Sequence, residues 1–238
     1  LTNLKEFALS IYSRNQLKYK WIPKVFQKLK ALHKINVSIT SVSQHRQGNQ
    51  SIFKLDEILS SISQSISKPK ALEFSAKELS LPSNLDENAF PELKELTLFS
   101  EWLNLDDLKK ILSAMSQQKG TRLNWHGAFL RGKTQAQKLK EFLCWLPSHI
   151  DFSISITITN MWERDIIHLV EDLVDGVSLH NDLNIIFMLR RLSINVIGLF
   201  KIKQALVRKP KFDFSIINED TTGLHFSRRY CVSNATLS

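Results

Sequence analysis

The chain has 238 residues, of which 43% are hydrophobic, a proportion typical of a soluble globular protein. Lys and Arg outnumber Asp and Glu, which gives a formal net charge of +9 at pH 7. No apolar run approaches the roughly 20 residues that a membrane-spanning helix needs, and the first ten residues lack the features of a signal peptide. These observations exclude a protein with helical membrane spans.

Residues 1–34 are predicted to form an N-terminal helical cap. Apolar residues at i, i+3, i+4 and i+7 predict an opening helix; they are Leu4, Phe7, Ala8 and Ile11. A brief strand is predicted where Leu17, Tyr19 and Trp21 alternate with lysines. Pro23 suits the first turn of a second helix, because its missing N–H has no helical partner there. The apolar stripe of that helix is Ile22, Val25, Phe26 and Leu29.

From residue 35 onward the pattern alternates between strands and helices. Strict alternation of apolar and polar residues predicts strands at 35–40 and 71–75. An apolar quartet between them predicts a helix at 53–66. Residues 81–92 contain two prolines and no quartet, so we expect an irregular return segment there.

The clearest pattern lies in residues 93–147, which hold two copies of a strand, a polar turn and an amphipathic helix. The strand anchors of the first copy are Leu96, Leu98 and Leu103, and those of the second are Leu123, Trp125 and Leu130. The first helix follows with Leu108, Ile111, Leu112 and Met115, and the second with Leu139, Phe142, Leu143 and Leu146. The two copies are offset by 27 residues. This repeat length suits a solenoid of strand-helix units.

After the central pair, residues 150–158 alternate strictly and predict a strand, and a quartet predicts a helix at 162–174. Val177 and Leu179 are expected to begin another strand. The units then shorten, and the run at 186–189 predicts a brief helix.

Further along, Ile194 and Val196 predict a strand, residues 199–207 a helix and residues 211–217 a last strand. Residues 218–238 are expected to form a C-terminal cap or tail, because an end repeat without a cap exposes its apolar side.

The segments LKELTLFSEWL at 93–103 and RLNWHGAFL at 122–130 resemble the leucine-rich-repeat pattern. The helical second halves and the 27-residue spacing are similar to the ribonuclease-inhibitor-like class of that family. The resemblance implies an α/β solenoid over residues 35–217, with parallel strands on the concave face and helices on the convex face. The Asn that the family places in the bend is replaced by Glu101 and Ala128. The irregular spacing of the later strands is a second departure.

The resemblance also implies that the exposed strand positions form the binding surface. The candidate residues for partner binding are Glu95, Thr97, Phe99, Arg122, Asn124, His126, Ser155, Thr157, Ser178 and His180. This set is polar and mostly neutral and contains an exposed aromatic, which suits a protein partner. The competing interpretation is a solvated sheet face with no partner. The leading hypothesis is a non-catalytic protein-interaction module, with no cofactor and no metal.

Residues 127–134 match G-x-x-x-x-G-K-[ST], the pattern of a phosphate-binding loop. In that hypothesis Lys133 contacts phosphate and Thr134 holds Mg²⁺. The bulky Phe129 and Leu130 count against it, because Leu130 is in frame with the core anchor Leu103. A repeat bend that fits the pattern by chance is the favoured interpretation.

Nucleic-acid binding is the main alternative function. Residues 18–24 interleave Lys18, Lys20 and Lys24 with Tyr19 and Trp21, as in proteins that bind single strands. The two aromatic residues share one strand face, however, and are expected to pack inward. The remaining Lys and Arg residues are spread thinly, which favours solvated helix faces.

Composition also gives an expectation about the setting. Cys144 and Cys231 are the only cysteines, and Cys144 lies on a predicted helix where we expect a packed thiol. This pattern suits a reducing compartment such as the cytoplasm. Rich usage of Lys, Asn, Ile and Ser suits an AT-rich bacterial genome, in which eukaryote-like repeats favour an effector secreted into the host cytoplasm.

Overall fold

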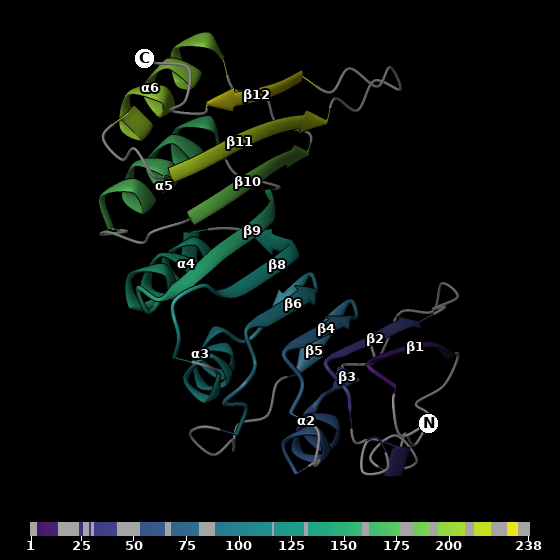
Figure 1. Cartoon of the computed structure of the whole chain (residues 1–238). Coiled ribbons are helices and arrows are strands. Elements are labelled where there is room, and N and C mark those ends of the chain that lie inside the picture. The colour runs from purple at the N-terminus through teal and green to yellow at the C-terminus, as the bar shows by residue number, and fades with distance from the viewer. Residues whose placement is uncertain are drawn as a thin grey trace. The chain divides into compact units, whose positions relative to one another are not determined.

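The computed structural model has a mixed α/β fold built on parallel strands, shown in Figure 1. It describes residues 4–13, 24–25, 29, 31–41, 53–64, 68–80, 89–115, 117–130, 133–158, 162–176, 183–190, 195–207, 212–219 and 228–232. The chain divides into two compact units, residues 1–126 and 127–238. The division falls inside strand β8 (Thr121–Leu130).

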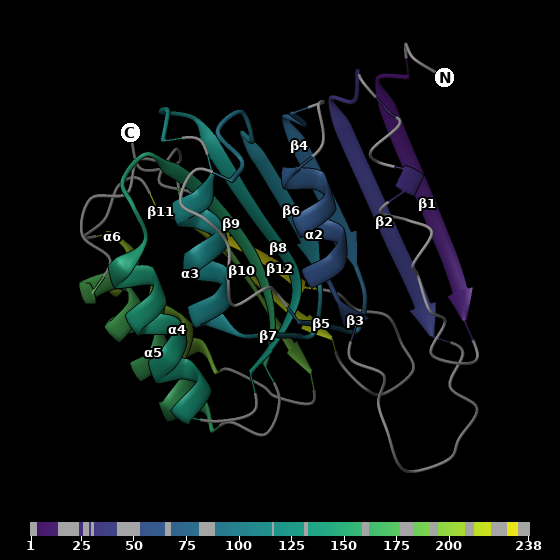
Figure 2. The ribbon, with the colours of Figure 1, turned by 90° about the horizontal axis from the view of Figure 1, so that it is seen from below.

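The first unit contains a parallel sheet with helices on one of its faces. Its strands, in spatial order, are β1 (Glu6–Ser13), β2 (Lys34–Ser41), β4 (Ala71–Ser75), β6 (Glu95–Phe99) and β8. The helices are α2 (Asp56–Ser63) and α3 (Leu105–Ala114), and Figure 2 shows both on the same side of the strands. A second, small parallel sheet joins β3 (Phe53–Lys54), β5 (Glu78–Ser80) and β7 (Trp102–Leu103).

The core of the first unit lies between the sheet and these helices. Alternate strand residues point to it, so the register stacks them in two apolar rows. The first row is Ile35, Leu72, Leu96 and Leu123, and the second is Val37, Phe74, Leu98 and Trp125. All of these side chains are at most 6% exposed. Burying one such side chain stabilises the fold by about 1.5–3 kcal/mol, so the two rows determine which face of each strand is buried.

The bend after β6 is held by hydrogen bonds to the segments that precede and follow it. The Ser100 N–H donates to the His126 carbonyl at 3.0 Å, and the Ser100 hydroxyl donates to the Lys77 carbonyl at 3.2 Å. The Glu101 N–H donates to the same Lys77 carbonyl, and the indole N–H of Trp125 donates to the Ser100 carbonyl, each at 3.0 Å. Ser100 therefore ties the bend to the strand units on both sides of it.

The second unit alternates helices and strands. Its elements are α4 (Lys133–Trp145), β9 (Ile150–Ile158), α5 (Glu163–Gly176), β10 (Leu183–Arg190), α6 (Val196–Val207), β11 (Phe212–Glu219) and β12 (Arg228–Val232). Strands β9, β10 and β11 are neighbours and parallel, whereas β12 pairs with β11 in the antiparallel direction. Phe142 of α4 packs edge-on against Phe152 of β9, with ring centroids 5.8 Å apart. Within the described residues, no helix is long and apolar enough to span a bilayer.

Most of the predicted elements are confirmed. The strands predicted at 71–75 and 150–158 match β4 and β9 residue for residue. Those predicted at 35–40 and 211–217 correspond to β2 and β11, and the helices at 53–66 and 162–174 correspond to α2 and α5. The 27-residue offset is confirmed by the parallel register, which pairs Leu96 with Leu123.

The helix predicted at the N-terminus is wrong, because residues 6–13 form strand β1. The quartet of Leu4, Phe7, Ala8 and Ile11 coincides with a second pattern of period two. Phe7, Leu9 and Ile11 alternate with polar or small residues, and each pairs with an apolar residue of β2. Cross-strand packing along the whole of β2 therefore outweighs the helical periodicity. Of the second predicted helix, Lys24 and Val25 are helical; the strand predicted at 17–21 lies outside the described residues.

Two predictions near residue 190 are also wrong. The run predicted as a brief helix at 186–189 belongs to the eight-residue strand β10, which has a parallel neighbour on each side. A continuous apolar run is consistent with either structure, and pairing on both edges decides in favour of a strand. Ile185 is thus the residue opposite Ile154. Val196, predicted to lie in a strand, begins α6.

Candidate interaction face

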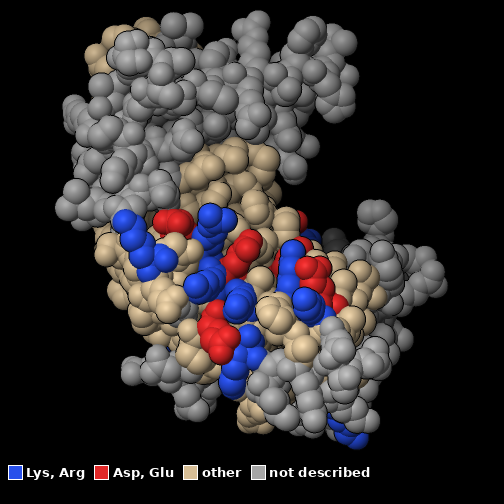
Figure 3. All heavy atoms as spheres, viewed as in Figure 1, with Lys and Arg blue, Asp and Glu red and all other residues tan. Residues whose placement is uncertain are grey.

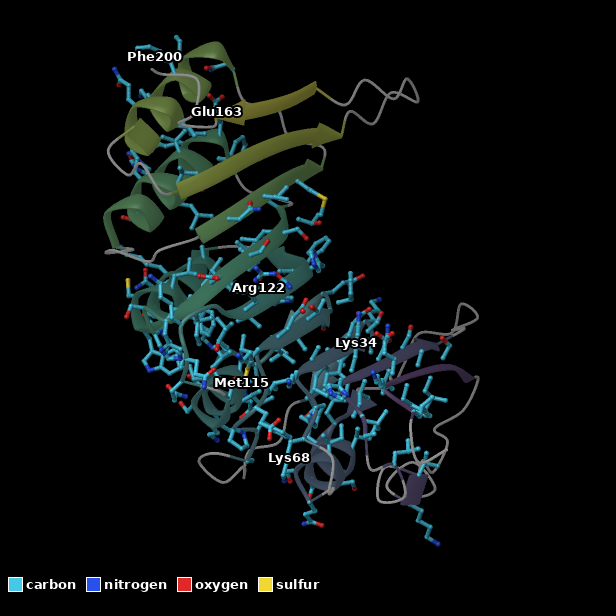
Figure 4. All side chains as sticks on the ribbon, viewed as in Figure 1. Lys34, Lys68, Met115, Arg122, Glu163 and Phe200 are labelled. Carbon is cyan, nitrogen blue, oxygen red and sulfur yellow. The ribbon has the colours of Figure 1, made fainter. Side chains whose placement is uncertain are left out.

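The sheet face of the first unit that points away from α2 and α3 carries three rows of side chains. We call this surface, made by alternate residues of β2, β4, β6 and β8, the open face. Its rows are Lys34, Ala71, Glu95 and Arg122; Asn36, Glu73, Thr97 and Asn124; and Ser38, Ser75, Phe99 and His126. None of these side chains is buried. Figure 4 labels Lys34 and Arg122, which lie at the two ends of the first row.

The middle row is held in place by hydrogen bonds between neighbouring strands. Asn36 Nδ2 donates to Glu73 Oε1 at 2.9 Å, and Lys34 Nζ lies 3.9 Å from Glu73 Oε2. Further along the row, Asn124 Nδ2 donates to Thr97 Oγ1 at 3.3 Å. Contacts of this kind add only about 0.2–1 kcal/mol each to stability. Their effect is to fix the orientation of the amide and carboxylate groups on the open face.

The third row ends in an aromatic pair. The rings of Phe99 and His126 stack with centroids 4.8 Å apart and planes inclined by 23°. Phe99 is nevertheless 40% exposed. Burial lowers the pKa of His126 below 6.5, although the Glu73 carboxylate opposes this by attracting the charged form. At neutral pH the pair therefore presents an uncharged aromatic surface beside Ser75.

The six predicted site residues in β6 and β8 lie together on this open face; they are Glu95, Thr97, Phe99, Arg122, Asn124 and His126. Sequence reasoning missed the contribution of β2, namely Lys34, Asn36 and Ser38. The signal was present, because the alternation of INVSIT assigns Asn36 and Ser38 to the face opposite the apolar residues.

The predicted site residues of the second unit are partly or fully buried, or lie outside the described residues. Ser155 is half-buried, and its hydroxyl accepts a hydrogen bond from the Gly127 N–H at 3.0 Å. Thr157 is only 4% exposed, so its assignment to an exposed binding face is wrong. Met188 lies directly opposite Thr157 on β10. Ser178 and His180 lie outside the described residues.

The phosphate-loop pattern begins in an extended strand. Residues 127–130 belong to β8, and the side chains of Ala128 and Leu130 are buried. The Gly127 N–H is engaged by Ser155, and Gly127 adopts a positive φ of 80° that suits glycine. A loop that wraps a phosphate needs several free backbone N–H groups at these positions. The geometry therefore favours a strand of the repeat over a nucleotide site.

Exposed apolar side chains of the second unit gather at the N-terminal ends of α5 and α6. Trp162 and Ile197 line a groove there with a volume of about 1030 Å³. Phe200, one helical turn beyond Ile197, is also exposed and is labelled in Figure 4. The side chains around the groove carry charges of both signs, including Glu163 and Lys201. This groove differs from the open face, because its exposed apolar side chains come from helix ends and not from a sheet.

Three further features of the chain are the thiol of Cys144, its metal-ligating residue types and the basic segment at 18–24. Cys144, predicted to be a packed thiol, is exposed near the end of α4, because the buried face of that helix is formed by Leu139, Phe142 and Leu143. Among the described residues, no group of three His, Cys, Asp or Glu side chains could hold a metal ion. The basic segment at 18–24 lies almost wholly outside them.

No known family model matches the sequence, and no curated protein matches it. Function is therefore inferred from the open face, where exposure, an aromatic pair and oriented polar groups coincide.

Proposed function

We propose that the chain is a non-catalytic protein-interaction module that binds a protein partner on its open face. We further propose that its repeats form a solenoid of the leucine-rich-repeat kind. The in-register row of Leu72, Leu96 and Leu123 supports this, since each residue begins one strand-bend unit of similar construction. Helices on one side of the first unit leave the other side of its sheet available for contact (Figure 2).

One observation carries the proposal: polar groups oriented across strands lie next to an exposed aromatic pair. Protein interfaces are enriched in aromatic residues at their centre and make about one hydrogen bond per 100–200 Å². The Phe99 and His126 stack supplies the first feature, and Asn36, Glu73 and Asn124 supply the second. A metal or phosphate site would instead need converging charged ligands.

The size of the open face limits what it binds by itself. Four strands about 4.8 Å apart, with three rows about 6.6 Å apart, cover an area on the order of 200 Å². A stable protein interface buries about 800 Å² on each partner. The partner is therefore expected to extend beyond the three rows, onto a neighbouring strand or an edge of the sheet.

Affinity capture with matched variants tests the proposal. The tagged chain is incubated with eukaryotic cell lysate, with and without nuclease, because the composition favours an effector in a host cytoplasm. Asn124→Arg places a long charged side chain in the middle row, whereas Ser113→Arg adds the same charge to an exposed position on α3. Far-UV circular dichroism checks that both variants fold.

The expected result is a discrete protein that survives nuclease treatment and is captured by the wild type and by Ser113→Arg. Asn124→Arg is expected to lose it, because the new side chain collides with a partner seated on Thr97 and Asn124. Equal capture by all three proteins would overturn the proposal. Recovery of nucleic acid, with proteins that vanish after nuclease treatment, would favour the nucleic-acid alternative.

A further inference from the structure

Four basic residues of the first unit occupy equivalent positions, each immediately before a strand. We call them the basic ladder; they are Lys5, His33, Lys70 and Lys94, which precede β1, β2, β4 and β6. Their equivalence follows from the backbone, since the carbonyl of each accepts an N–H group at the start of the next strand. Lys5 accepts from Lys34, His33 from Ala71, Lys70 from Glu95 and Lys94 from Arg122.

All four side chains of the basic ladder are exposed. Lys70 and Lys94 precede neighbouring strands, which are about 4.8 Å apart, so their positive charges lie within a Debye length of about 8 Å. Like charges placed opposite each other on adjacent strands are destabilising. The equivalent position in β8 is Thr121, which is buried and donates its hydroxyl to the Gln118 carbonyl at 2.8 Å. The ladder therefore ends at β8, and the fold itself does not require basic residues at these positions.

Acidic residues also lie near the ladder. Glu6 and Glu95 belong to the row of side chains next to it, and Glu92 is exposed two residues before Lys94. Figure 3 accordingly shows acidic side chains among the basic ones over β4 and β6. A continuous polyphosphate would face these carboxylates as well as the ladder. A peptide, in contrast, can place carboxylates against the ladder and a basic or neutral residue against Glu95.

We propose that the basic ladder binds an acidic segment of the protein partner, a step that rests on the proposed function of the open face. Carboxylates on one side of an α-helix are about 5–6 Å apart, close to the spacing of the ladder. The aromatic pair lies at the opposite end of the strands, roughly 16 Å from Lys94 along β6. Strand alternation assigns Lys94 to the side of Leu96 and Phe99 to the open face. The partner thus combines an acidic segment at the strand starts with an apolar group that reaches the open face around the edge of the sheet. Contact at both ends also supplies the interface area that the three rows lack.

Two single substitutions near opposite ends of β4 distinguish binding at the basic ladder from a general effect of the net charge of the protein. Lys70→Glu reverses a charge in the ladder, and Lys77→Glu reverses that of another exposed lysine beyond the end of the same strand. Both change the net charge equally. Lys70→Glu also places a carboxylate beside Lys94 on the neighbouring strand, so its midpoint of thermal unfolding is expected to equal or exceed that of the wild type.

Fluorescence anisotropy of two labelled probes at about 0.05 and 0.15 M salt gives the affinities. The first probe is a glutamate-rich helical peptide, and the second is an oligothymidylate of equal charge. The wild type is expected to bind the peptide more tightly than the oligothymidylate. Lys70→Glu is expected to weaken peptide binding by at least about fivefold, and Lys77→Glu by less than about twofold, because only the first charge contacts the peptide.

Equal weakening by the two substitutions would overturn the proposal, since net charge alone would then explain binding. Tighter binding of the oligothymidylate would overturn it in favour of nucleic acid. Affinity capture can refute the open-face proposal and the basic-ladder proposal independently of each other. If Asn124→Arg loses the partner and Lys70→Glu retains it, the open face stands and the ladder fails. If Asn124→Arg retains the partner, the open-face proposal fails whatever the peptide measurements show.

Discussion

Replacing Leu98 by alanine tests whether the two faces of the first sheet are correctly assigned. Leu98 lies in β6, with Phe74 opposite it on one neighbouring strand and Trp125 on the other. It is fully buried, whereas Thr97, the preceding residue, belongs to the open face. Adjacent substitutions in the same strand should therefore have very different effects on the free energy of unfolding.

The magnitude follows from the atoms that are removed. Leu98→Ala deletes three buried carbons, at about 0.8 kcal/mol each, and leaves a cavity between two aromatic neighbours that cannot easily close. The expected loss is about 3–4 kcal/mol, within the range of about 2–5 kcal/mol for buried leucines. Thr97→Ala removes one weak hydrogen bond from Asn124 at a half-exposed position, so its expected loss is below about 1 kcal/mol.

Urea unfolding followed by far-UV circular dichroism measures both losses in the full chain. The difference between the two variants is the informative quantity, because the total stability of such a domain is only about 5–15 kcal/mol. A Thr97→Ala loss equal to that of Leu98→Ala would refute the assignment of the faces, and with it the open face.

Three further outcomes follow from local geometry. Because burial lowers the pKa of His126 below 6.5, the folded state resists protonation. The contribution of His126 to the free energy of unfolding is then fully present above pH 6.5 and is lost as the pH drops toward the folded-state pKa. Urea unfolding at several pH values measures this loss, which should shrink in His126→Phe. Asn104→Ala removes the side-chain oxygen that accepts the Asp106 N–H at 3.0 Å and caps α3, so unfolding free energy should fall by about 0.5–2 kcal/mol. A smaller change than in the exposed control Ser113→Ala would contradict the cap. Gly127→Ala should lower the midpoint of thermal unfolding, since a positive φ costs an L-residue roughly 1–2 kcal/mol, and an unchanged midpoint would contradict this backbone geometry.

The central elements were predictable because local pattern and tertiary packing agree there. Leu96 and Leu98 alternate in a short strand, and the same spacing recurs in Leu123 and Trp125, so periodicity alone locates two units. The N-terminal strand was missed because Phe7 and Ile11 satisfy both a helical and a strand period. Pairing with β2 decides between them, and it is not visible in a local window.

The site was predictable only in part, for a similar reason. Alternation identified Phe99, Asn124 and His126, because it assigns every second residue of a strand to one face. It failed for Thr157, which shares the alternation of Ser155 but is only 4% exposed, so alternation alone does not decide burial. The basic ladder was invisible because the sequence intervals between its members are unequal. Only the backbone register of four strands brings Lys5, His33, Lys70 and Lys94 into one line.

The unequal intervals between the ladder residues indicate that the connections between strands can change in length. Strand starts are aligned by paired backbone groups, so the length of the segment between two strands does not set their register. Closing a longer connection costs only about 0.6 kcal/mol for each doubling of its length. Insertions and deletions between units therefore change the free energy of unfolding only slightly and leave the neighbouring rows in place. A chain built in this way can accept an inserted segment, such as an epitope tag, between two strands while the rows of side chains keep their register.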